Sequence, residues 1–227
     1  MAPGVRSSSA KPVALPRRMT VREFLATDFG VEGRVELIDG IPTRWDGTPI
    51  WPEHASPAAR GATPSAQASP HKRHGRIQGA LCAHLYMTLR ERNARTGQDC
   101  QPVTEAGVLT PLDPDHNYRV ADIAVTCETF GAEDDPWVAA PVLIVEVLSP
   151  DQEKEQRSKL QALAALDSVR EILFIDSRII RAELHRRDAD GHWPAGPTVL
   201  TADDRLALDS EELDLPLADL YRGIARA

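Results

Sequence analysis

Two single acids inside apolar runs are the residues of this sequence best placed to do chemistry. Asp122 lies within Tyr118-Arg-Val-Ala-Asp-Ile-Ala-Val125, and Glu146 lies within Leu143-Ile-Val-Glu-Val-Leu148. Burying an acid among apolar residues is costly unless a cation or a hydrogen-bond donor meets it. Lys159 follows Glu146 by thirteen residues. Two acids and a nearby lysine favour a divalent-metal site, because a cation relieves the repulsion between close carboxylates.

The chemistry that suits such a site is phosphodiester hydrolysis, which needs a hard cation to polarise the phosphate and lower the pKa of an attacking water. Mg²⁺ prefers oxygen ligands, typically one or two carboxylates. We expect Asp122 and Glu146 to hold Mg²⁺, with Mn²⁺ as a substitute and the backbone carbonyl of Val147 as a third protein ligand. Lys159 would orient the attacking water or balance charge in the transition state.

Each of these residues also has a simpler interpretation when taken singly. Asp122 alone is more typical of a hydrogen-bonded strand residue than of a metal ligand. Lys159 alone is typical of a solvated helix residue, because Glu155 lies four positions before it on the same face. The order of the three residues together is what favours the metal site.

The spacing of apolar residues and the capping signals predict the elements that position these side chains. Ile77, Leu81, Leu85 and Leu89 repeat at helical spacing and predict a long helix over about 71–95. Ser149-Pro-Asp-Gln152 is typical of a helix start, with that helix running to about Leu166. The other predicted elements are a capped helix from Thr20 to about Asp28, strands at 34–40, 41–45, 100–110, 118–126, 141–149, 171–176 and 179–186, a turn at 188–191, a weak strand at 204–209, and a closing helix at 217–226. This order predicts an α/β fold with a mixed central β-sheet flanked by α-helices.

Length and composition fit one soluble domain. The 227 residues predict a flexible leader over 1–19 and a single domain over 20–227, with a Pro/Ala-rich insertion at about 46–70. The net charge of −8 argues against a broadly basic surface. The odd number of cysteines, three without CxxC spacing, argues against a disulfide scaffold and favours a reduced, cytoplasmic location. No apolar run is long enough for a signal peptide or a membrane span.

Several short motifs, in their order along the chain, resemble a known family. They are Val35-Glu-Leu-Ile-Asp-Gly40, Ser69-Pro-His-Lys-Arg-His-Gly-Arg-Ile77, Arg119-Val-Ala-Asp-Ile123, Glu146-Val-Leu-Ser-Pro150, Lys159 and Val169-Arg-Glu-Ile-Leu-Phe-Ile-Asp176. This order over residues 19–186 resembles the Uma-two family, restriction-endonuclease-like proteins of the PD-(D/E)xK nuclease superfamily. The resemblance implies a restriction-endonuclease-like core and Mg²⁺-dependent cleavage of DNA. Homodimers are common in that superfamily, so the resemblance also implies a homodimer.

The resemblance also implies roles for individual residues. Asp122 and Glu146 match the two acids, and Lys159 matches a lysine that has moved to the following helix, so that Leu148 stands at the usual lysine position. Glu36 matches an acid near the metal, and His74 matches a histidine at the start of the long helix.

The residues flanking that histidine, and Glu36 itself, have open alternatives. Glu36 could pair with Arg34 or Arg44, and His74 is also typical of a helix-terminal histidine that meets the core. The basic residues at the start of the long helix are typical of a solvated face, but a phosphate-contacting role is the alternative that we retain for Lys72, Arg73 and Arg76.

The expected function is therefore endonucleolytic hydrolysis of DNA with Mg²⁺. One alternative is a nucleic-acid or protein-binding module that keeps the fold without the chemistry, which the negative net charge and Ala121, where the family usually has proline, favour slightly. The other alternative is a metal-dependent hydrolase of RNA or nucleotides. The sequence itself does not choose between DNA and RNA.

Overall fold

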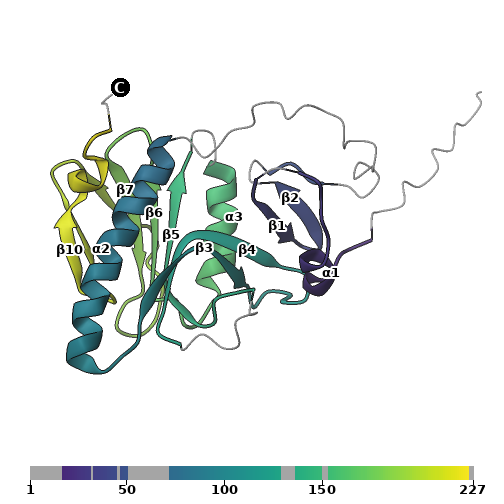
Figure 1. Cartoon of the computed structure of the whole chain (residues 1–227), viewed down its shortest axis with the longest axis horizontal. Coiled ribbons are helices and arrows are strands. Elements are labelled where there is room, and N and C mark those ends of the chain that lie inside the picture. The colour runs from purple at the N-terminus through teal and green to yellow at the C-terminus, as the bar shows by residue number, and fades with distance from the viewer. Residues whose placement is uncertain are drawn as a thin grey trace, which may run out of the picture.

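A mixed β-sheet carries helices on both of its faces in the computed structural model of this chain (Figure 1). The structure describes residues 17–31, 33–44, 47–50, 72–128, 136–149 and 153–224, with the backbone alone for 153–157. The elements in chain order are α1 (Val21–Leu25), β1 (Val35–Ile38), β2 (Ile41–Arg44), α2 (Lys72–Thr96), β3 (Gln101–Leu109), β4 (Tyr118–Thr126), β5 (Pro141–Leu148), α3 (Glu153–Ala164), β6 (Glu171–Asp176), β7 (Arg181–Arg186), β8 (Thr198–Thr201), β9 (Arg205–Leu208), β10 (Leu213–Pro216) and the 3₁₀ helix η3 (Leu217–Tyr221).

The main sheet has the strand order β2-β1-β4-β5-β6-β7-β8, with β3 paired to β4. Its neighbours are antiparallel except β5 and β6, which run parallel and are joined through α3. Strands β9 and β10 form a separate hairpin. The observed architecture is the α/β class with a mixed sheet that the sequence predicts.

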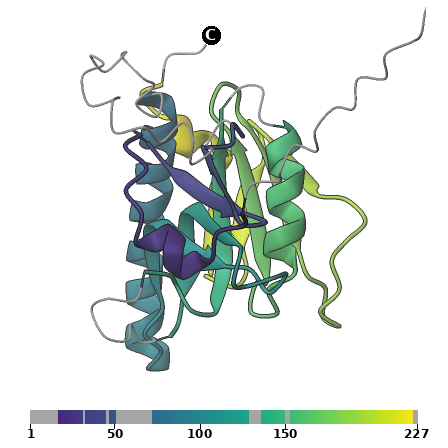
Figure 2. The same cartoon turned by 90° about the vertical axis from the view of Figure 1, so that its right-hand side faces the viewer.

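The two long helices cover opposite faces of this sheet (Figure 2). On one face α2 buries Ile77, Leu81, Leu85 and Leu89 against β4, β5 and β6, and the β9–β10 hairpin closes the same core. On the other face α3 contributes Leu163, which packs with β5 and β6 residues such as Ile144. The apolar period of the predicted long helix is therefore the stripe that meets the sheet.

One edge of β4 is shared by two strands that leave a gap between them. β3 pairs along the whole of β4, so β1 and β5 lie on the opposite edge. β1 pairs with it at Tyr118, and the β5 ladder begins at Ile123. Among the described strands none pairs with residues 119–122 on that edge. Backbone groups in such a gap need other hydrogen-bond partners, and the side chains of the candidate site supply them.

Most predicted elements are confirmed, and the differences lie near the C-terminus. The capping box of Thr20 and Glu23 starts α1 as expected, with hydrogen bonds in both directions. Strands β8 and β10 are not in the prediction. The closing helix predicted over 217–226 is wrong in its extent, because the described residues as far as 224 form only the 3₁₀ turn η3, and Gly223 adopts a positive φ of 76°.

Parts of the predicted leader, insertion and helix start lie outside the described residues. Within the leader, the amide of Met19 donates to the carbonyl of Gly40, so the chain joins the domain before residue 20. Within the insertion, Pro49 forms a β-bridge with Thr43, and residues 51–71 are not described. α3 begins at Glu153, after the undescribed residues 150–152 of its predicted start.

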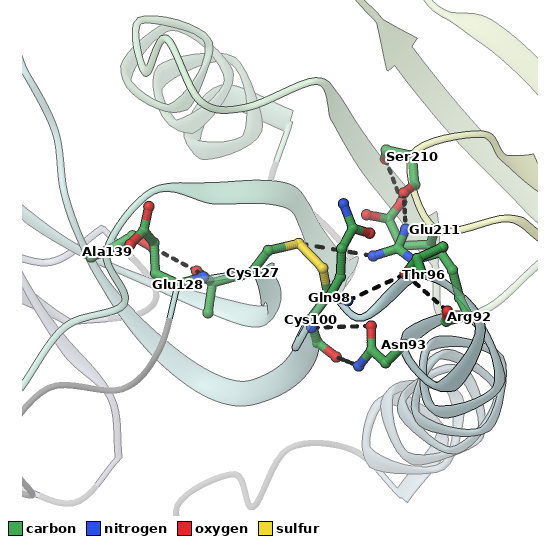
Figure 3. Close-up of a disulfide and its surroundings, with 11 residues drawn as sticks. Arg92, Asn93, Thr96, Gln98, Cys100, Cys127, Glu128, Ala139, Ser210 and Glu211 are labelled. Carbon is green, nitrogen blue, oxygen red and sulfur yellow. Dashed lines mark hydrogen bonds between the residues drawn. A yellow bond between two sulfur atoms is a disulfide. The ribbon is translucent and has the colours of Figure 1, made fainter.

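A disulfide joins Cys100 and Cys127, whereas the number and spacing of the cysteines argue against a disulfide scaffold and favour a reduced location (Figure 3). The register of β3 and β4 pairs Gln101 with Thr126, so the two cysteines face each other just beyond the ladder. The side-chain amide of Asn93, near the end of α2, bonds the carbonyl of Cys100 at 2.7 Å and its amide at 3.2 Å. Cys82 is a free thiol.

The described helices include none that combines the length and the apolar character needed to cross a membrane.

Candidate active site

Lys159 is buried between two carboxylates and is not a solvated helix residue. Its Nζ lies 3.1 Å from both carboxylate oxygens of Glu146 and 2.9 Å from Oε1 of Glu36. The side chain of Lys159 is 15% exposed, and each glutamate residue is 5% exposed. Lys159 lies about two turns into α3. The side chain of Glu155 lies outside the described residues.

Asp122 is almost fully buried and accepts three hydrogen bonds. Its Oδ2 accepts from the amide of Val147 at 2.6 Å and lies 3.1 Å from Nε2 of His74. Its Oδ1 accepts from Nη2 of Arg34 at 2.6 Å. The last registered pair of the β4–β5 ladder is Ile123 with Val145, next to Asp122 and Glu146. Beyond this pair the amide of Val147 donates to the Asp122 side chain instead of to a strand carbonyl. The contact from Val147 is through its amide, and the metal-binding role of its carbonyl stays a prediction.

Side chains satisfy the backbone of Val120 in the gap on β4. Glu36 accepts from the amide of Val120 at 3.1 Å, and Lys159 donates to its carbonyl at 3.2 Å. Arg34 donates to the same carbonyl at 3.2 Å. Glu36 pairs as well with Arg119 at 3.3 Å, not with Arg34 or Arg44. The sheet therefore needs these charged side chains to complete its edge.

The pKa of Glu146 is raised in this cluster, whereas the pKa values of Asp122 and Glu36 are lowered. Burial raises the pKa of Glu146 to about 7, against the charge of Lys159 and with the help of Asp122. Burial would also raise the pKa of Asp122, but the hydrogen bond from His74 and the charge of Arg34 outweigh it and hold that pKa below its ordinary value. The pKa of Glu36 is lowered, because Lys159 and Arg119 together outweigh its burial. Two acids with pKa values pushed apart are typical of functional sites.

The sequence does not single out four residues that complete the cluster. Arg34 joins Asp122 to Glu105, and Gln78 donates to Glu105 at 3.1 Å and to the carbonyl of Asp122 at 2.7 Å. Arg119 pairs with Glu36. For this set the sequence carries one signal, which is that Arg119 is a charged residue inside an apolar, strand-like run. In the structure Arg119 is 5% exposed. The tertiary fold alone brings Arg34 and Gln78 to Asp122, and Glu105 to Arg34 and Gln78.

The basic residues at the start of α2 differ in their burial and their contacts. His74 is buried and bonds Asp122, so it belongs to the cluster and is not a surface contact. Lys72 and Arg76 are exposed, and Arg76 donates to the carbonyl of Arg222 at 2.8 Å, which joins α2 to the C-terminal segment. Arg73 is half-buried. A phosphate-contacting role for Lys72, Arg73 and Arg76 stays a prediction.

Asp188, Asp190 and His192 are the one group of three His, Cys, Asp or Glu residues, among those the structure describes, whose ligand atoms lie within 4.8 Å of one another. All three are exposed. The carboxylate of Asp188 already accepts the amides of Asp190 and His192, as an Asx-type turn does. This group closes a turn, and it makes no contact that would link it to the buried acids.

The donor set of the buried cluster fits a hard divalent cation. Asp122 and Glu146 offer carboxylate oxygens at the end of one β-ladder, as Mg²⁺ requires. Without a cation, the three buried acids are balanced by Lys159, Arg34 and Arg119. A cation bound there would replace part of this pairing.

Comparison with known proteins gives one family and one fold. An uncharacterised protein of Synechocystis sp. is 28% identical over 153 residues, which are 66% of this chain and 73% of that protein. The crystal structure of a "putative nuclease belonging to DUF820" from Anabaena variabilis has a TM-score of 0.61 at 20% identity, covering 89% of this chain and 97% of that one. This likeness confirms the mixed α/β fold.

The family model of Uma2, described as "Putative restriction endonuclease", matches residues 63–218. The match includes Asp122, Glu146 and Lys159, begins after Glu36, and extends beyond the 19–186 range of the motif resemblance. It covers more than half of the chain. The chain therefore belongs to the Uma2 family, the Uma-two family that its motif order resembles.

Proposed function

We propose that this protein is a divalent-metal-dependent endonuclease that hydrolyses DNA phosphodiester bonds. The observation that carries the proposal is the convergence of Asp122, Glu146, Glu36 and Lys159 in the gap on β4. These residues come from three strands and a helix and are separated by up to 123 positions in the sequence, so only the tertiary fold brings them together.

We assign each residue of the cluster a role in this reaction. Asp122 and Glu146 would hold Mg²⁺ or Mn²⁺, together with the carbonyl of Val147, and Glu36 would support the water shell of the ion or a second ion. The bound ion supplies polarisation of the phosphate and a lower pKa of the attacking water. Lys159, held by Glu146 and Glu36, would place its ammonium beside that water.

The ion pairs of the cluster favour one second candidate, a binding module without catalysis. Each of the three buried acids already has a cationic partner, so the network is complete without chemistry. A homodimer and a cytoplasmic location stay predictions. The cysteine count no longer supports a cytoplasmic location, because Cys100 and Cys127 form a disulfide.

The test is cleavage of supercoiled plasmid and labelled DNA and RNA oligonucleotides with Mg²⁺ or Mn²⁺. We expect DNA cleavage by the wild type and losses of at least about a hundredfold in Asp122→Asn, Glu146→Gln and Lys159→Met. Arg205→Gln, an exposed ion-pair variant on β9, is the matched control and should keep full activity.

Three other outcomes have distinct meanings. Cleavage of RNA alone would replace the substrate class. Equal activity in all three site variants would refute the site. No cleavage by the wild type, with nucleic-acid binding that needs no metal, would favour the binding module.

A further inference from the structure

The guanidinium of Arg34 is shared by two acids of unequal burial. Its Nη2 lies 2.6 Å from Oδ1 of Asp122 and 2.6 Å from Oε2 of Glu105, and its Nε lies 3.1 Å from the same Glu105 oxygen. Its Nη1 donates to the carbonyl of Val120 at 3.2 Å. Asp122 is almost fully buried, whereas the side chain of Glu105 is 55% exposed. Arg34 therefore bridges the inside of the cluster and its solvent side.

Glu105 is held in an unusual backbone conformation that places it there. Its φ is +51° in the middle of β3, between the registered pairs Thr104–Ile123 and Ala106–Ala121, so it lies across from Asp122. A positive φ is uncommon for a residue with a side chain, and such outliers gather at functional sites. Gln78 of α2 donates to the second carboxylate oxygen of Glu105 at 3.1 Å.

The contacts of Arg34 survive if it leaves Asp122. Glu105 would still bind it through Nε and Nη2, and the carbonyl of Val120 would still accept from Nη1. Only one N–H of Nη2 would be freed, and it would face the space beside the Asp122 carboxylate. A guanidinium with a free N–H beside the reacting group is suited to a phosphate oxygen.

We propose that Arg34 occupies Asp122 before a divalent cation binds, and that Glu105 is the positioning residue that then holds the Arg34 guanidinium for the phosphate of the substrate. This inference rests on the proposed function and extends it by two residues. Arg34 competes with the metal for Asp122, and Glu105 relieves that competition. A purely structural bridge between β1 and β3 would change stability but would not change metal affinity in opposite directions.

The experiment is calorimetric titration of the full-length protein with Mg²⁺ and Mn²⁺, with nucleic-acid binding measured separately. Arg34→Gln should bind metal roughly tenfold more tightly, the factor for losing one competing charge-assisted hydrogen bond, and should bind DNA more weakly. Glu105→Gln should bind metal roughly tenfold more weakly, because Arg34 then has only Asp122 as its acidic partner.

The double variant separates this exchange from a simple change of net charge. In the Arg34→Gln background, Glu105→Gln should change metal affinity by less than about threefold, because an exposed charge is largely screened. Arg205→Gln should leave metal affinity unchanged. Glu105 is exposed, so Glu105→Gln keeps the proposal testable even if Arg34→Gln does not fold.

The outcomes distinguish this inference from the proposed function. Wild-type metal binding that is lost in Asp122→Asn, with unchanged affinity in Glu105→Gln or looser binding in Arg34→Gln, would overturn the role of Arg34 and leave the metal site standing. A wild type without metal-dependent heat would overturn both. Tight binding in Arg34→Gln with additive effects in the double variant would reduce the result to net charge and overturn the exchange.

Discussion

Replacing Lys159 with methionine should destabilise the protein by about 3–5 kcal/mol near pH 8. Methionine has a similar length but no charge, so the substitution leaves Glu146 and Glu36 without the ammonium that lies about 3 Å from each. Both glutamates are 5% exposed, so water cannot readily replace the ammonium. Removing one partner of a buried ion pair costs more than the pair itself is worth.

The loss in Lys159→Met should grow with pH. Burial already raises the pKa of Glu146 to about 7 with Lys159 present, and removing Lys159 raises that pKa further. It also removes the main charge that lowers the pKa of Glu36. The folded variant then binds more protons than its unfolded chain, and its stability falls as pH rises. Each additional pKa unit amounts to about 1.4 kcal/mol. The difference from wild type should therefore be smaller at pH 5.5 than at pH 8.

Urea unfolding followed by circular dichroism at both pH values measures this difference. Adding Glu146→Gln to Lys159→Met should recover about 1–2 kcal/mol, because one unpaired carboxylate is removed. Arg205→Gln is the control for loss of an exposed pair and should change stability by less than about 1 kcal/mol. A loss below about 1 kcal/mol in Lys159→Met, or a larger loss at pH 5.5, would refute the position of Lys159 between two buried acids.

Two further predictions concern groups away from the site. Burial and the charge of Glu171 raise the pKa of Glu211 to about 8, so the folded state keeps a proton that the unfolded state loses above about pH 4.5. Wild-type stability should therefore fall as pH rises towards 8, and Glu211→Gln should be more stable than wild type at pH 8.5, by roughly 4 kcal/mol in urea unfolding; an unchanged pH profile would contradict this. Reduction of the Cys100–Cys127 disulfide, which spans 27 positions, should lower stability by about 3.5 kcal/mol. Thiol titration of the unfolded protein should give only the Cys82 thiol before reduction, and three thiols without reductant would show that the bond does not form.

The fold was largely predictable because its core elements carry strong periodic signals. The stripe of Ile77, Leu81, Leu85 and Leu89 defines α2, and the apolar runs around Asp122 and Glu146 define β4 and β5. The C-terminal part was less predictable. Strands β8 and β10 have four residues each, too few to show a period, and their pairing depends on neighbours from elsewhere in the chain.

The site was predictable in its acids and lysine but not in the partners of these residues. Asp122 and Glu146 stand out because an acid in an apolar run is unusual, and Lys159 follows at a fixed helical distance. Arg34 and Glu105 look like ordinary surface residues in the sequence. Their meeting depends on the gap beside β4 and on a backbone φ that no residue type announces. The disulfide could not be predicted for a related reason. The register of β3 against β4, and not the spacing of the cysteines in the sequence, brings Cys100 to Cys127.

The charge balance of the buried cluster has a consequence for the order of folding and metal uptake. Structural zinc sites leave their domains unfolded until the metal arrives. Here Lys159, Arg34 and Arg119 neutralise the acids as the sheet forms, and the same side chains complete the edge of β4 at Val120. The chain can therefore fold as it is synthesised, without depending on the cellular supply of divalent ions. A chelator should leave it folded.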